Sequence, residues 1–195
     1  MRSAFAILLA GLLGFPAIAD AQTTGRSSAG IVAEEPQARM QRLFAELKRA
    51  GNEQAARRVS SRIQQEWSRS GSASIDLLMQ WSQKAMEEKK NGVAMDFLNE
   101  VVTLAPDYAE GWNRRATLHF TLNDYARSMA DIDRVLRLEP RHFGALSGLA
   151  TILRNTGRKE AAMHAYERLL DIYPMMRDAQ TELGRLADDM AGQGI

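Results

Sequence analysis

The chain has 195 residues, with 25 lysines and arginines against 24 aspartates and glutamates, and it contains no cysteine. A net charge of +1 argues against a nucleic-acid-binding surface as its main role, because phosphate binding depends on an excess of positive charge. The lack of cysteine excludes a disulfide framework, a thiolate metal site and a lipid anchor on a cysteine after a signal.

Residues 1–21 are predicted to be a secretory signal peptide. Arg2 precedes an apolar run over 4–19, which is shorter than the ~20 residues of a membrane-spanning helix. Two small-x-small cleavage patterns close this run, Ala17-Ile18-Ala19 and Ala19-Asp20-Ala21. The mature chain is therefore expected to begin at Asp20 or Gln22, exported to a bacterial periplasm. A retained signal that anchors the chain is the alternative.

The segment that follows has two parts. Residues 22–36 have few large apolar side chains and no periodicity, which indicates a flexible mature N-terminus without a site. Residues 37–74 are predicted to form a weak, divergent first helical hairpin and a joint. Residues at helical spacing flank Gly51 in this hairpin: Met40, Leu43, Phe44, Leu47, Ala56, Ser60 and Ile63. The segment 68–72 adds about four residues to the period seen further on, which predicts a loosened joint.

Three prolines then mark an internal repeat. Pro106, Pro140 and Pro174 are 34 residues apart, since 140 − 106 = 34 and 174 − 140 = 34. That period is typical of stacked helical hairpins and predicts three repeats, over 75–108, 109–142 and 143–176. Small residues recur where the two helices of each hairpin must approach closely: Ser82, Ala116 and Ala150, and then Ala94, Ser128 and Ala162.

The residues between the prolines resemble those of a known family. The last block carries the fullest set of signature residues: Leu146, Leu149, Ala150, Leu153, Gly157, Ala162, Tyr166 and Leu169. On these residues, the chain resembles the tetratricopeptide repeat (TPR) family over roughly 37–190. The resemblance implies an all-α, right-handed solenoid of antiparallel hairpins, with 177–195 as a capping helix and tail. We expect seven or eight helices and no strands.

The first helices of such repeats line a concave surface that binds other proteins. Carried onto this sequence, the resemblance places three stripes and one edge residue on that surface: Met79, Gln83 and Met86; Asn113, Thr117 and Phe120; Ser147, Thr151 and Arg154; and Arg114. The alternative is that Met79, Met86 and Phe120 only fill space between hairpins. One subclass of the family grips a terminal carboxylate, but Glu110 stands where a lysine would help, so no such clamp is predicted.

Two further expectations concern structure. Arg115 occupies a place that a subclass of these repeats gives to an arginine paired with an aspartate, and Asp131 stands at the matching position, so we predict a buried ion pair. Asp107 and Glu110 have the spacing of a capping box, which predicts a helix that begins near Tyr108.

The sequence favours an adaptor that binds a peptide or protein segment, and it indicates no enzyme, cofactor, metal or nucleic-acid site. His119, His142 and His164 are 23 and 22 residues apart, whereas two ligands on one helix face are three or four apart. A membrane-anchored scaffold that organises an envelope complex is the alternative. An enzyme would need titratable groups that converge in one cleft, and no motif of that kind is evident.

Overall fold

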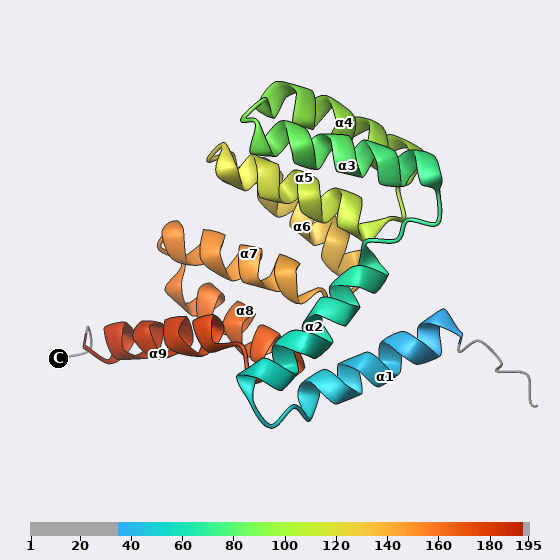
Figure 1. Cartoon of the computed structure of the whole chain (residues 1–195). Helices are drawn as coiled ribbons and strands as arrows, with labels where there is room; N and C mark the ends of the chain where they lie inside the picture. The colour runs from blue at the N-terminus through green and yellow to red at the C-terminus, as the bar shows by residue number, and fades with distance from the viewer. Residues whose placement is uncertain (1–34, 193–195) are drawn as a thin grey trace, which may run out of the picture. The chain divides into compact units, whose positions relative to one another are not determined.

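A computed structural model describes residues 35–192, and within them the chain forms nine helices and no strand (Figure 1). The expected count of seven or eight was too low. The helices are α1 (Pro36–Lys48), α2 (Glu53–Trp67), α3 (Ala73–Glu87), α4 (Asn91–Leu104), α5 (Ala109–Thr121), α6 (Tyr125–Leu138), α7 (Phe143–Asn155), α8 (Lys159–Ile172) and α9 (Arg177–Ala191). The expected signal, 1–21, and all but the last two residues of 22–36 lie outside the described residues.

The turns inside the last three hairpins repeat the 34-residue period. Each turn holds one residue with positive φ: Lys89 (58°), Asn123 (59°) and Gly157 (74°). After each of them, a backbone N–H bonds to a carbonyl five residues earlier, as from Lys90 to Ala85 at 2.8 Å. This left-handed residue closes the end of the first helix and reverses the chain. The same turn, with one left-handed residue, therefore joins the two helices of each hairpin: α3–α4, α5–α6 and α7–α8.

Close packing inside each hairpin depends on the small residues predicted above. Ser82, Ala94, Ala150 and Ala162 are fully buried, and Ala116 and Ser128 nearly so. The Ser128 hydroxyl donates to the Ala116 carbonyl at 2.8 Å, which ties α6 to α5. Side chains without large volume are needed here because the two helix backbones come close.

The apolar core is divided along the stack. Ile75, Leu98 and Val101 belong to a cluster formed by α3 and α4 with Leu118 of α5. A second cluster joins α5, α6 and α7, and a third joins α7, α8 and α9. Each repeat therefore buries its apolar surface against its neighbours, as expected for a solenoid.

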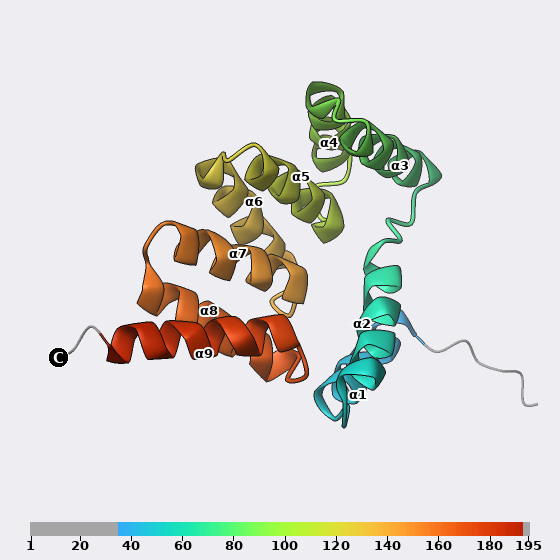
Figure 2. The same cartoon turned by 60° about the vertical axis from the view of Figure 1, so that its left-hand side comes forward.

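The first hairpin, α1–α2, does not continue this stack. Its residues Leu43, Leu47 and Ile63 share a core with α7, α8 and α9, and the cluster of α3–α4 contains no residue from α1 or α2. An extended connection leads from α2 to α3, and α2 lies beside the first turn of α7 (Figures 1 and 2). In space, the hairpin lies along the loops that join successive repeats, and it does not stack on the first repeat.

Aromatic contacts hold α1–α2 in this position. Trp67, at the end of α2, stacks on His142 with ring centroids 4.1 Å apart and lies 4.8 Å from Phe143. The guanidinium of Arg141 lies over the ring of Phe44, 4.0 Å from its centroid. Stacked and cation–π contacts of this kind add to the area that the rings bury.

The joint between α2 and α3 is longer than the loops between repeats, and it carries its own hydrogen bonds. The Ser70 hydroxyl donates to Asp76 Oδ1 at 2.6 Å, and the Tyr108 hydroxyl donates to the Ser68 carbonyl at 3.0 Å. Gly71 has a φ of 79°, which only glycine adopts without strain. These contacts hold the joint in place and so determine how α2 is oriented relative to α3.

Candidate functional site

The first helices of the three repeats, α3, α5 and α7, line a groove made of three adjoining hollows. The hollow between α5 and α7 has a volume of about 180 Å³. A second hollow of about 500 Å³ lies between α2, α5 and the start of α7, and a third of about 780 Å³ lies between α3 and α5. Asn113 and Gly144 line both the first and the second, whereas Glu110 and Arg114 line both the second and the third.

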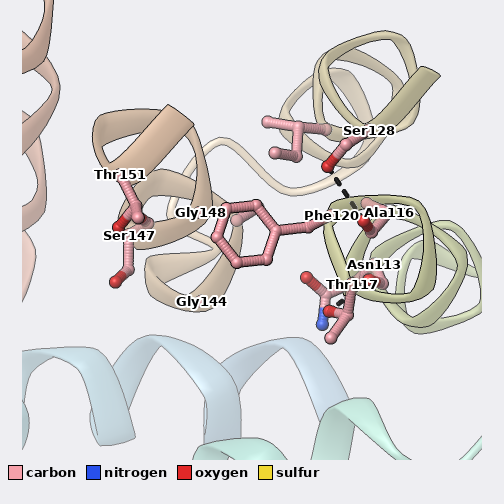
Figure 3. Close-up of a pocket in the computed structure, with 11 residues that line it drawn as sticks. Asn113, Ala116, Thr117, Phe120, Ser128, Gly144, Ser147, Gly148 and Thr151 are labelled. Atoms are coloured by element: carbon pink, nitrogen blue, oxygen red, sulfur yellow. Dashed lines mark hydrogen bonds between the residues drawn. The ribbon is translucent and has the colours of Figure 1, made fainter. Parts of the chain in front are cut away.

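The first hollow is apolar at its centre and polar at its edges. Phe120 extends from α5 toward Gly148 of α7, with Thr117 on one side and Thr151 on the other (Figure 3). A Cβ on Gly148 would lie in van der Waals contact with Ile132 Cδ1, 3.4 Å away, and its absence leaves that volume to the hollow. The hollow is suited to a small apolar side chain flanked by main-chain groups.

The second hollow has a wall that the repeats do not provide. Helix α2 contributes Gln64, Gln65 and Trp67 to it, and α5 contributes Asn113. Three side-chain amides around one hollow can donate to and accept from a peptide main chain. The first hairpin therefore extends the groove beyond the surface that α3, α5 and α7 would form by themselves.

Glu110 is the centre of a polar network at the junction of the second and third hollows. Its Oε1 accepts from Arg114 Nη2 at 3.2 Å, and its Oε2 accepts from Asn113 Nδ2 at 3.0 Å. Arg114 also donates to Gln83 of α3. Burial alone would raise the pKa of Glu110, but the neighbouring His142 ring and the positive charge of Arg114 outweigh burial and hold it below the ordinary 4.5. The carboxylate is therefore ionised at neutral pH.

This network replaces the capping box predicted for α5. No side chain caps the helix at Tyr108, so the expectation for Asp107 and Glu110 was wrong. The Glu110 carboxylate turns toward Arg114 and His142, because an arginine one turn along the helix offers it a full charge. The helix does begin next to Tyr108, at Ala109.

His142 is a structural residue that the sequence did not identify. Its Nδ1 accepts from the backbone N–H of Ala145 at 3.1 Å and thereby caps α7. Because Nδ1 accepts, the proton of the neutral ring is on Nε2, which is buried, forms no standard hydrogen bond and lies 3.4 Å from Glu110 Oε2. One ring thus links α7, the Glu110 network and Trp67. The signal available in the sequence was its place just before the first residue of a predicted helix.

The structure brings most of the predicted stripe residues to the groove. Five line the first hollow: Asn113, Thr117, Phe120, Ser147 and Thr151. Three line the third hollow: Met79, Gln83 and Arg114. Whether they bind a partner stays a prediction.

Three stripe residues have roles inside the molecule. Met79 is buried in the α3–α4 core, with 9% of its surface exposed, and Met86 packs against the same cluster. Arg154 forms an ion pair with Glu182 of α9. Met86 and Arg154 do not line the hollows, because neighbouring core residues and the capping helix engage them first.

The predicted ion pair is present beside the groove. Arg115 binds both carboxylate oxygens of Asp131, at 2.8 and 2.7 Å, and also donates to Asn99 Oδ1 of α4 at 3.0 Å. It packs against the Trp112 ring, 4.8 Å from the centroid. This pair joins α5 to α6, and its contact with Asn99 reaches the preceding repeat.

Taken together, the repeated hairpins and the groove along their first helices define a helical-repeat protein. The family profile described as Tetratricopeptide repeat matches residues 109–142 and 144–174. A TPR repeat-containing protein of Rhizobium etli is 53% identical over 157 residues, which cover 80% of this chain and 77% of that protein. The chain belongs to the tetratricopeptide repeat family.

Solved structures show the same fold. The first TPR domain of Spaghetti (RPAP3), solved with an HSP90 peptide, is similar with a TM-score of 0.57 and 22% identity, over 60% of this chain and 93% of that one. The MamA protein gives a TM-score of 0.56 at 16% identity, over 80% of this chain and 84% of that one. The predicted all-α solenoid of hairpins is confirmed.

Proposed function

We propose that this protein is an adaptor that binds a peptide or protein segment in the groove of α3, α5 and α7, and that it is not an enzyme. The observation that carries the proposal is the continuity of three hollows along one face, with an apolar centre at Phe120. A neighbour of the same fold was solved with an HSP90 peptide, which supports a peptide as the kind of ligand.

The charges of the groove restrict the ligand. Arg114, the one arginine that lines the second and third hollows together, is already paired with Glu110 and Gln83. A free terminal carboxylate that bound Arg114 would have to displace Glu110 from that arginine, and the ionised Glu110 would repel it. We therefore propose an internal segment with a small apolar side chain, bound through its main chain, as the ligand.

The test is to fill the first hollow without touching the core. Thr117 and Thr121 are exposed residues on α5, and each hydroxyl donates to the carbonyl four residues earlier at 2.9 Å. Thr117 lines the hollow and Thr121 does not. We expect Thr117→Trp to abolish capture of crosslinked partners from an envelope extract. Thr121→Trp should leave capture unchanged.

Helicity and thermal unfolding of both variants should match the wild type, because neither threonine is in the core. If folded Thr117→Trp still retains the partner set of the wild type, the groove is not the binding surface. Loss of capture in both variants would also contradict the proposal, since the change would then not be specific to the hollow.

We also propose that the protein acts in the bacterial periplasm, on the signal-like pattern of residues 1–21. No helix within residues 35–192 is long and apolar enough to cross a membrane. N-terminal sequencing of the protein released by osmotic shock should give Asp20 or Gln22 as the first residue. Recovery in the membrane fraction with Arg2 retained would favour the anchored scaffold instead.

A further inference from the structure

Large apolar side chains are exposed mainly on one hairpin of the described chain. Of the five such residues within 35–192, four lie on α3 and α4, and the fifth is Leu122 at the end of α5. The four are Leu77 (42% exposed), Trp81 (46%), Val93 (46%) and Leu104 (59%). Leu77 and Trp81 are four residues apart on α3, so they share one helix face. A clustered apolar surface of this kind marks an interaction site more often than scattered single residues do.

Two of these side chains, Trp81 and Val93, line a shallow cleft. Trp81 lies 5.6 Å from Phe97, measured between ring centroids, and the two rings line a cleft of about 340 Å³ with Val93. Lys84, Lys90 and Glu88 form its polar edge. The cleft is on the side of α3–α4 where a preceding repeat would stack, and no other part of residues 35–192 covers it.

The later repeats show why α1–α2 does not cover this surface. In α5 and α7 the positions equivalent to Leu77 are Gly111 and Ala145, both buried (77 + 34 = 111; 111 + 34 = 145). A Cβ at Gly111 would come within 2.7 Å of Val101 Cγ1 on the preceding α4. A leucine at this position therefore prevents a second helix from approaching α3 as closely as α4 approaches α5. This face is not shaped for another hairpin in the regular stack.

The rest of the chain indicates what covers the face instead. Helix α9, at the other end of the solenoid, exposes no large apolar residue within the described chain, so a head-to-tail contact between copies has no second surface. Of the two ends of the stack within residues 35–192, the α3–α4 end is the one that exposes large apolar side chains, and a second copy that presents the same face brings matching apolar side chains to it. The polar edge carries both signs of charge, so two identical faces need not repel each other.

We propose that the α3–α4 face is the contact of a two-fold symmetric dimer of this protein, in which Trp81 and Phe97 of each copy pack against the other. Symmetric contacts through one shared patch are the commonest form of homodimer. The large side chains at 77, 81, 93 and 97 interdigitate at a wider helix spacing than in the stack. The edge residues Lys84 and Glu88 also line the third hollow of the groove, but Trp81, Val93 and Phe97 line none of the three hollows. The dimer contact does not depend on the proposed function.

Sedimentation velocity of the mature chain, from micromolar to millimolar concentration, tests the proposal. We expect a concentration-dependent shift from monomer to dimer. Trp81→Lys should weaken dimerisation by about 30-fold or more, as for a central interface tryptophan. Leu122→Lys is the matched control, because Leu122 is also 46% exposed and lies off this face. Circular dichroism establishes that both variants are folded, and Val93→Lys provides a second disruption.

A single introduced cysteine gives an independent measurement, since the chain has none. Val93→Cys should yield a covalent dimer with a short bis-maleimide crosslinker, and Leu122→Cys should not. A wild type that stays monomeric over the whole concentration range overturns the proposal. This holds even if Trp81→Lys abolishes binding of a different protein. A dimer that Trp81→Lys and Val93→Lys leave intact also overturns it, because the contact would lie elsewhere.

Discussion

Replacing Arg115 by leucine is expected to lower the free energy of unfolding by about 3–5 kcal/mol, because it leaves the buried Asp131 carboxylate without its partner. Only 6% of the Asp131 side chain and 18% of the Arg115 side chain are exposed. Asp131→Leu should cost somewhat less, because Arg115 keeps its bond to Asn99 and its contact with Trp112. The double replacement should cost clearly less than the sum of the two single changes.

Urea unfolding of the four proteins measures this coupling. The series should be run well above the ordinary His119 pKa of 6.5, because His119 Nε2 lies 3.9 Å from Asp131 and could replace part of the lost charge if protonated. Burial lowers the pKa of His119 despite this carboxylate, so the ring is neutral there. Additive effects of Arg115→Leu and Asp131→Leu would contradict a coupled pair.

The repeats themselves were predictable because their signal is local and periodic. The spacing of Pro106, Pro140 and Pro174 set the three hairpins, and Gly157 marked a turn that the structure repeats at Lys89 and Asn123. The resemblance to a subclass of these repeats that pairs an arginine with an aspartate predicted the contact of Arg115 with Asp131, and the stack fixes which helices are neighbours. Periodicity determines contacts of this kind because each repeat packs only on adjacent ones.

The position of α1–α2 was not predictable from the period. Trp67 and His142 are 75 residues apart in the sequence (142 − 67 = 75). Whether two residues so far apart along the chain come into contact depends on how strongly the solenoid curves. The sequence did carry one signal, Leu77 in the place that Gly111 and Ala145 occupy later. That leucine is larger than the residues that pack closely on the preceding repeat at Gly111 and Ala145, but it does not indicate where the first hairpin packs.

The groove was predictable in outline and not in its charges. Helical spacing brought Asn113, Thr117 and Phe120 to one hollow. The pair of Glu110 and Arg114 has i, i+4 spacing on one helix and was open to prediction, whereas the partner of Arg154 lies on another helix, α9. A charged side chain pairs with the nearest opposite charge in the folded chain. When that charge lies on another helix, the spacing of residues along one helix does not identify it.

Trp67→Ala is expected to lower the free energy of unfolding by about 3 kcal/mol and to release α1–α2 from the repeats. The indole packs on His142 and Phe143, and its ring centroid lies 5.9 Å from that of Phe44. Its loss therefore opens a gap at the centre of the contact. Release frees the joint, where the Arg69 side chain is already 67% exposed. Limited trypsin digestion should therefore cut after Arg69 much faster than in the wild type.

Trp67→Phe is the control, since a smaller ring retains part of the stacking and should keep cleavage close to the wild-type rate. Partner capture gives a second measurement, because α2 forms one wall of the second hollow. A released hairpin removes that wall but leaves the hollow around Phe120 in place, so capture should weaken without disappearing. Unchanged cleavage and unchanged stability in Trp67→Ala would show that the aromatic contact does not hold the hairpin, and that the shared core of Leu43, Leu47 and Ile63 is sufficient.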